Sequence, residues 1–293
     1  MGALARIAYP DMPAKRLAAL RILIGGYGFF YAVGRLNALY GVTRYPASQF
    51  RPVGPIVGLD APLPAWIVVA MIAATLLFGV AFVLGWRFRI TGPAFAVLQL
   101  VLLSYRNSWG MVFHTENLIV MHALVLALAP SADAWSLDAR GRDVPEDSPR
   151  YGWGVQLVSA VTVTSYFIAG YTKLEHAGFG WVWSDTLRNF IAYDNIRKLE
   201  LGATHSVIGG WLVQFDWLFP PLAATSLGIE LGAPLALLHR RVGMLWSVLA
   251  WGFHLGVLVL MFILFHYPLL GFAYASFFPI EKLGDAIERR LRR

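Results

Sequence analysis

The chain of 293 residues contains no cysteine and few charged side chains. The absence of cysteine excludes disulfides, thiolate metal ligands, cysteine nucleophiles and iron–sulfur clusters. Charged residues make up 14% of the chain, whereas soluble domains carry about 25%. No polar stretch is long enough to form a separate soluble domain. We therefore expect one domain over residues 1–293.

Histidine is sparse and scattered, which argues against a histidine-rich di-iron site. Membrane desaturases and hydroxylases carry histidines three or four residues apart, but no two of the seven here lie closer than eight residues. We therefore expect no catalytic metal, although ligands on distant helices can converge. The net charge of +7 comes mostly from short loops and tails between apolar segments, so we do not expect nucleic-acid binding.

Apolar residues dominate the chain, at 58%, and they recur in runs along its whole length. Lipid leaves no backbone group unsatisfied, so the pattern predicts an all-α, polytopic membrane bundle. A span needs about 20 apolar residues. We expect about eight transmembrane helices, near Leu17–Leu39, Ala65–Gly85, Gly92–Tyr105, Glu116–Ala129, Gly152–Tyr171, Pro221–Leu238, Val242–Phe265 and Tyr267–Phe278.

Basic residues predict the orientation of these spans. Arginine and lysine gather at the N-terminus, at the tail and after the second, fourth and sixth spans, as expected for cytoplasmic loops. Both termini would then be cytoplasmic. The segment Trp181–Phe219 would lie outside, as interfacial helix or a re-entrant piece.

The fifth span ends in a distinctive run that carries a lysine: Tyr166-Phe167-Ile168-Ala169-Gly170-Tyr171-Thr172-Lys173-Leu174. An ammonium near the bilayer core is costly, which makes Lys173 a candidate functional residue. A lysine can act as a general base once it is deprotonated. Alternatively, Lys173 anchors the helix end by reaching into the headgroups.

Other polar residues in apolar surroundings are candidates for binding substrate or cofactor. Trp109, His114 and Asn117 lie in the stretch 108–117, which could line a site or simply cap the next helix. Glu230 and His254 are candidates for buried partners across two helices. Their alternative role is an ordinary hydrogen bond between helices.

Three segments together resemble the transmembrane module of vitamin K-dependent gamma-glutamyl carboxylase and its bacterial relatives, the horizontally transferred transmembrane (HTTM) proteins. The first is the run that ends in Lys173-Leu174, followed by Trp181 or Trp183. The second is Ser108-Trp109 with His114, and then a helix that leads to Trp135-Ser136-Leu137-Asp138. The third is Phe253-His254-Leu255, followed by Ile263, Phe265 and Pro268. The resemblance covers nearly the whole chain.

The resemblance implies that Lys173 is the base that deprotonates a reduced vitamin K or menaquinone-type hydroquinone, and that His114 assists. Oxygen would be a co-substrate, and carbon dioxide could add to a glutamyl group. We expect a bacterial inner-membrane protein with its active site on the non-cytoplasmic side. Its partners would be membrane lipid, isoprenoid quinone and a secreted peptide.

Two kinds of function therefore stay open. The first is an enzyme of this kind. The carboxylase carries a large soluble domain after its helices and this sequence does not, so we expect quinone epoxidation before carboxylation. The alternative is a non-catalytic membrane protein that binds quinone or lipid, or assists the maturation or export of a secreted peptide.

Overall fold

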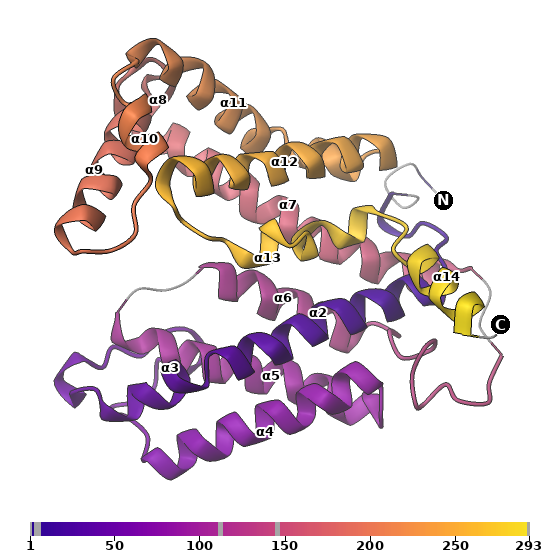
Figure 1. Ribbon diagram of the computed structural model, residues 1–293. Coiled ribbons are helices and arrows are strands. Elements are labelled where there is room, and N and C mark those ends of the chain that lie inside the picture. Colours follow the sequence, from indigo (N-terminus) through magenta and orange to yellow (C-terminus); the bar gives the residue numbers. More distant parts are fainter. Residues whose placement is uncertain (1, 3–6, 111–113, 144–146, 292–293) are drawn as a thin grey trace. The chain divides into compact units, whose positions relative to one another are not determined.

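The computed structural model describes residues 2, 7–110, 114–143 and 147–291, and these ranges are almost entirely helical (Figure 1). Within them, the extended pairing is one isolated bridge between Met12 and Ser148. The expectation of an all-α chain with membrane-spanning helices is therefore confirmed. The chain divides into two compact units, Met1–Val158 with Phe278–Arg293, and Ser159–Phe277.

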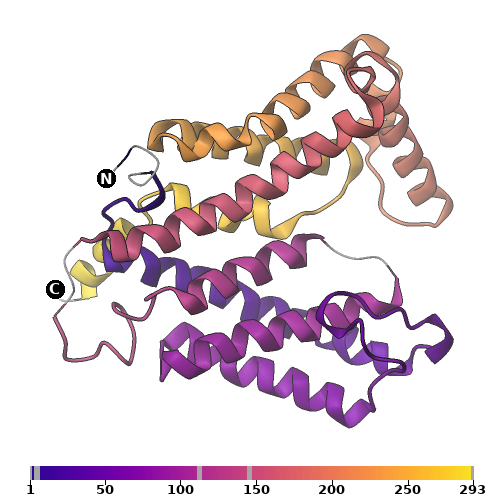
Figure 2. The ribbon, with the colours of Figure 1, turned by 180° about the vertical axis from the view of Figure 1, so that it is seen from behind.

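The first unit is a bundle of apolar helices. Its elements are α2 (Ala14–Gly34), α3 (Leu36–Gly41), η1 (Val42–Arg44), η2 (Ala47–Gln49), η3 (Gly54–Ile56), α4 (Ala65–Leu84), α5 (Phe88–Arg106), η4 (Asn107–Trp109), α6 (His114–Leu128), the start of α7 (Pro149–Ala177) and α14 (Glu281–Leu291). Helices α4 and α5 lie side by side in both views of the ribbon (Figures 1 and 2). Gly25 and Gly28 of α2 let α4 and α5 approach, because a Cβ atom there would strike Phe82 or Gln99.

The second unit is formed by the rest of α7 and by the helices that follow it. They are α8 (Gly180–Trp183), α9 (Thr186–Glu200), α10 (Val207–Leu212), η5 (Asp216–Leu218), α11 (Phe219–Leu231), η6 (Ala233–Leu237), α12 (Arg240–Met261), α13 (His266–Leu269) and η7 (Phe272–Phe277). Side chains from α7 bond to the segment around η7: the Ser159 hydroxyl lies 2.8 Å from that of Ser276, and Thr162 donates to the Ala273 carbonyl.

The end of α12 is fixed by polar side chains from the α9–α10 region. Asn195 donates to the Leu260 carbonyl and Lys198 to that of Met261, while Ser206 donates to that of Val259. These are carbonyls of the last helical turn, which lack partners within the helix. A cation there also complements the helix dipole. The short helices after α8 thus have a definite structural role in the second unit.

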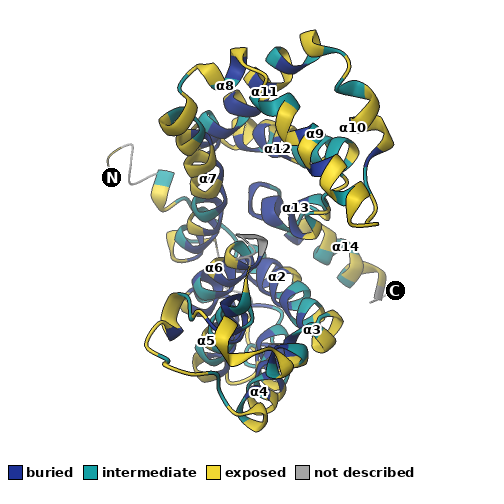
Figure 3. Ribbon diagram, turned by 90° about the vertical axis from the view of Figure 1, so that its left-hand side faces the viewer, coloured by how far each residue is buried: buried dark blue, intermediate teal, exposed yellow. Residues whose placement is uncertain are grey.

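Five of the described helices are long and apolar enough to cross a membrane: Ala14–Gly34, Ala65–Leu84, Phe88–Trp109, Pro149–Ala177 and Arg240–Met261. A sixth apolar segment, Glu116–Leu128, is shorter. Large apolar side chains on these helices remain uncovered, such as Trp66 and Leu77 of α4, both about 70% exposed. Figure 3 shows such exposed stretches on α4, and a lipid environment would cover them.

The count of eight spans is not confirmed. The expected span Pro221–Leu238 divides into α11, which ends at Leu231, and the 3₁₀ turn η6, which contains Pro234. The expected span Tyr267–Phe278 is the four-residue α13 followed by η7. Gly271 separates these two with φ +82°. Proline and left-handed glycine both interrupt a helix, so neither segment is one continuous helix, and their crossing of the membrane stays a prediction.

Candidate functional site

Lys173 lies near the end of α7, not at its last residue. The sequence predicted that the span would finish around Tyr171, but the helix continues to Ala177 and stops before Gly178, whose φ is +55°. Lys173 is therefore held by helical backbone on both sides. Its side chain is positioned by a regular helix rather than by a fraying end.

The Lys173 ammonium forms an ion pair with Glu230 of α11. Its Nζ atom lies 2.6 Å from both Oε1 and Oε2 of Glu230, and it donates to the Ser226 hydroxyl at 3.2 Å. Ser226 and Glu230 are four residues apart on α11, so they present one helical face to Lys173. The two charged side chains are only 20% and 4% exposed. Mutual attraction offsets part of the cost of removing both charges from water.

Gly170 explains how α7 and α11 come close enough for this contact. A Cβ atom at position 170 would lie 2.8 Å from the Cβ atom of Glu230 and 3.2 Å from the side chain of Leu231. Gly170 and Lys173 are three residues apart, and so they share a helical face. The glycine in the run before Lys173 thus serves the packing of two helices at the ion pair.

Two aromatic rings flank the Lys173 ammonium. Its Nζ atom lies 4.9 Å from the ring centroid of Trp181 in α8 and 5.8 Å from that of Phe253 in α12. Cations bind favourably to ring faces at such distances. The indole Nε1 of Trp181 is buried and has no hydrogen-bond partner among the residues that the structure describes. Buried donors are nearly always paired, so this one marks a place for an acceptor oxygen.

Glu230 meets a partner that the sequence did not suggest, because its carboxylate is bound to Lys173. The His254 ring packs among aromatic residues, with its centroid 5.7 Å from that of Tyr166 and 5.0 Å from that of Phe265. A contact between Glu230 and His254 stays a prediction. Helix periodicity identifies which residues are buried, but it does not identify the neighbouring helix that each one meets.

The remaining predicted site residues belong to the first unit. Trp109 fills an aromatic cluster, with its ring centroid 4.8 Å from Phe50 and 5.1 Å from Tyr105, and its indole donates to the Pro46 carbonyl. Asn117 is exposed on α6. His114 begins α6, but its side chain lies outside the described part. Lys173 and Glu230 belong to the second unit, so a joint role of Lys173 and His114 stays a prediction.

The first unit contains a buried ion pair that the sequence did not single out. The Glu116 Oε1 atom accepts from Arg106 Nη1 at 2.7 Å and from the Tyr31 hydroxyl at 2.6 Å. The Glu116 side chain is 1% exposed, and its Oε2 atom has no hydrogen-bond partner in the part of the chain that the structure describes. The available signal was a carboxylate and an arginine at the ends of two apolar runs. The sequence left open whether the stretch that contains Glu116 lines a polar site or caps the next helix, and it did not match Glu116 with Arg106.

No group of three or more histidine, aspartate or glutamate side chains is placed to hold a metal ion among the residues that the structure describes.

The comparisons with known proteins give one match. No curated protein and no solved structure matches the chain. The model of the HTTM domain, a membrane domain associated with vitamin K-dependent carboxylase, matches residues 9–281, which is nearly the whole chain. The chain therefore belongs to the HTTM family.

Proposed function

We propose that the protein is a membrane enzyme that oxidises a reduced naphthoquinone with oxygen, and that the Lys173–Glu230 pair is its base. The observation that carries the proposal is the position of this pair beside Trp181, whose buried indole N–H finds no acceptor in the described part of the chain. A ring that bears two oxygens fits this environment, since one oxygen could accept from Trp181 while the other faces Lys173. A bound hydroquinone would supply a weakly acidic ring hydroxyl and reactivity towards oxygen.

Proton movement at the pair follows from its geometry. As an ammonium, Lys173 cannot accept a proton, so its Nζ atom must first give one up. The nearest acceptors are the two Glu230 oxygens, each 2.6 Å away. Transfer to Glu230 leaves a neutral amine and a neutral acid, and this state is favoured when an apolar substrate displaces water. The amine then takes the hydroxyl proton, while Ser226 holds Nζ in place.

Coupling to carbon dioxide addition at a glutamyl group would extend the same reaction, with His114 assisting. A site on the non-cytoplasmic side of a bacterial inner membrane is part of this proposal. The non-catalytic alternative has its own support, because a fully paired lysine also suits a structural contact between α7 and α11. A quinone- or lipid-binding protein, or one that assists the maturation or export of a secreted peptide, would need no proton transfer.

Epoxide formation distinguishes the two. The purified protein would be given reduced vitamin K under oxygen, with and without a glutamyl peptide and bicarbonate, and the products separated by chromatography. We expect epoxide from the wild type and none above background from Lys173→Ala.

The matched control is Lys198→Ala. Lys198 is also a partly buried lysine in an ion pair, with Asp194 at 2.7 Å, but it lies on α9 and holds the end of α12. Its variant should keep the activity. Equal activity in the wild type and Lys173→Ala would remove Lys173 from the chemistry and favour the non-catalytic alternative.

A further inference from the structure

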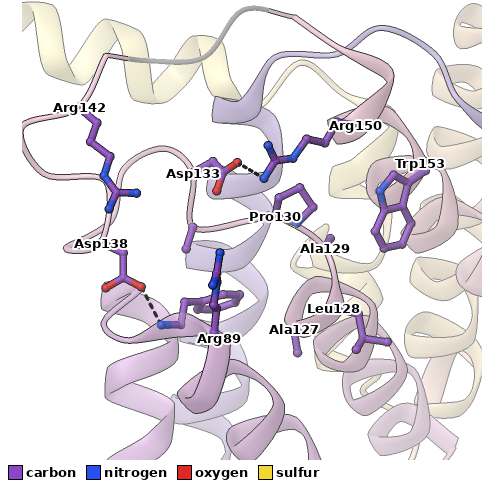
Figure 4. Close-up of a pocket in the computed structure, with 12 residues that line it drawn as sticks. Arg89, Ala127, Leu128, Ala129, Pro130, Asp133, Asp138, Arg142, Arg150 and Trp153 are labelled. Atoms are coloured by element: carbon purple, nitrogen blue, oxygen red, sulfur yellow. Dashed lines mark hydrogen bonds and ion pairs between the residues drawn. The ribbon is translucent and has the colours of Figure 1, made fainter.

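The first unit contains a cavity of about 450 Å³ where α5 and α7 begin and α6 ends. Its volume is in the range of small-molecule sites. Three arginines line it, namely Arg89, Arg142 and Arg150, together with Asp133 and Asp138. A second hollow of about 550 Å³ shares Arg89, Arg142 and Asp138 and adds Arg87. Figure 4 shows Arg142 and Asp138 on one side of the first cavity, and Leu128 and Trp153 on the other.

Both carboxylates in this cavity already have partners. Asp133 accepts from Arg150 at 3.0 Å and from the Tyr151 hydroxyl at 3.1 Å. The Asp138 carboxylate accepts from the backbone N–H groups of Arg87 and Phe88 at the start of α5, at 2.8 and 2.7 Å. Asp138 therefore occupies the donors of the helix end. An incoming anion would have to bind side chains instead.

Two arginines of the cavity are available for such an anion. In the ranges that the structure describes, Arg89 and Arg142 have no carboxylate within ion-pair distance and no side-chain hydrogen bond. Guanidinium groups bind phosphate oxygens through two parallel hydrogen bonds. Two unpaired guanidinium groups facing one hollow thus form a receptor for a phosphate group.

The wall that carries Asp138 is fixed to the bundle, and Arg142 lies on an exposed turn four residues further along. Arg21 of α2 is fully buried and donates to the carbonyls of Ser131 and Trp135, both at 2.5 Å. The backbone N–H groups of Leu137 and Asp138 bond to the carbonyls of Leu84 and Gly85 at the end of α4. The Asp138 wall of the cavity is therefore part of the folded unit, while Arg142 reaches the cavity from the exposed turn that follows it.

The far wall of the cavity is apolar and lies at the level of the span ends. Leu128, which is 74% exposed, and Trp153 face the hollow opposite the arginines. Arg89 and Arg150 are each the second residue of a helix long enough to span the membrane. Phospholipid headgroups lie at that depth, and basic pockets there bind anionic lipid. The pocket thus combines a phosphate receptor with a surface suited to acyl chains.

We propose that this cavity binds the phosphate group of an anionic phospholipid, with Arg89 and Arg142 on the phosphate and Leu128 and Trp153 against the acyl chains. An anionic headgroup is preferred over a zwitterionic one because a choline cation would be repelled by the arginines.

The test is native mass spectrometry of the purified full-length protein in detergent, titrated with dihexanoyl phosphatidylglycerol, dihexanoyl phosphatidylcholine or inorganic phosphate. Saturable binding of phosphatidylglycerol is expected, with weaker binding of phosphatidylcholine. The double variant Arg89→Gln/Arg142→Gln should bind phosphatidylglycerol roughly tenfold more weakly, because two charge-assisted contacts are lost.

The control double variant is Arg140→Gln/Lys282→Gln, which removes two exposed charges from the same unit outside the cavity. It should bind like the wild type. Equal weakening in both double variants would overturn the proposal in favour of unspecific charge. Inorganic phosphate that binds as tightly as the lipid would show a free-phosphate site instead.

A single variant serves as a second test, because Arg142→Gln alone changes only an exposed loop side chain. Should the double variant fail to fold, unchanged binding by this single variant would also overturn the proposal.

Discussion

The two units each bury an ion pair between apolar helices, and the pairs differ in the chemistry of their cation. In the first unit Arg106 binds one oxygen of Glu116, and Tyr31 binds the same oxygen. In the second unit Lys173 spans both oxygens of Glu230. Arginine cannot be deprotonated in proteins, whereas a lysine can lose its proton when its surroundings favour the amine. The first pair is therefore suited to fixing helices, and the second is suited to moving a proton as well.

Exchanging the two cations tests this difference most strongly. Lys173→Arg keeps the charge and the ion pair but removes the proton that can be given up. We therefore expect the rate of epoxide formation to fall by about 10²-fold or more, which is the usual contribution of a general base to the rate. Arg106→Lys should retain most of the activity. The chromatographic assay with reduced vitamin K measures both variants. An active Lys173→Arg enzyme would contradict the assignment of the base.

Removing one cation altogether should have a large effect on stability in the first unit. Arg106→Met leaves the carboxylate of Glu116, 1% exposed, with Tyr31 as its one remaining partner among the described residues. A stranded buried charge costs about 3–5 kcal/mol. Thermal unfolding in detergent, followed by tryptophan fluorescence, should show a clearly lower melting temperature, which Arg106→Met/Glu116→Gln partly restores.

The matched control for this loss is Arg150→Gln, which breaks the exposed pair with Asp133. Exposed pairs contribute about 0–1 kcal/mol, so its melting temperature should barely change. Similar melting of Arg106→Met and Arg150→Gln would show that burial does not set the strength of the first pair.

The sequence predicted the helical membrane fold and singled out both members of the second pair, but not that they meet. Lys173 and Glu230 each stood out as a charge within an apolar segment. Their contact joins residues 57 positions apart and depends on the close crossing of α7 and α11 at Gly170. Local patterns contain no information on which helices cross, so Glu230 was matched with His254 instead.

The same limitation explains the two expected spans that are not continuous helices and the overlooked pair in the first unit. Hydropathy counts apolar residues but does not register that Pro234 and Gly271 interrupt helical backbone. Glu116 belongs to a stretch whose residues also suit a helix cap, and only tertiary packing shows that Arg106 and Tyr31 surround it.

An added methyl group where α7 crosses α11 should have a smaller effect than the changes above, because it moves Lys173 and Glu230 apart without removing either side chain. Gly170→Ala places a Cβ atom 2.8 Å from that of Glu230, so α7 and α11 must move apart. Overpacking of this kind costs about 1–3 kcal/mol. We expect a lower melting temperature and reduced epoxide formation. Gly228→Ala on α11, where a Cβ atom would meet nothing within 4 Å, is the control and should change neither quantity.

Trp181→Phe should give the smallest effect. It distinguishes substrate binding from proton transfer by Lys173 and Glu230. The phenyl ring keeps an aromatic face near Lys173 but removes the buried N–H, which has no partner within the described ranges. Loss of an unpaired donor should leave the melting temperature unchanged or slightly raised, because no protein hydrogen bond is broken.

If an oxygen of the substrate accepts from the Trp181 N–H, KM for reduced vitamin K should rise in Trp181→Phe by roughly 2- to 10-fold, the equivalent of one hydrogen bond of about 0.5–1.5 kcal/mol. The value of kcat should stay near that of the wild type, since Lys173 and Glu230 are untouched. A fall in kcat without a change in KM would instead make Trp181 a residue that positions the ammonium of Lys173.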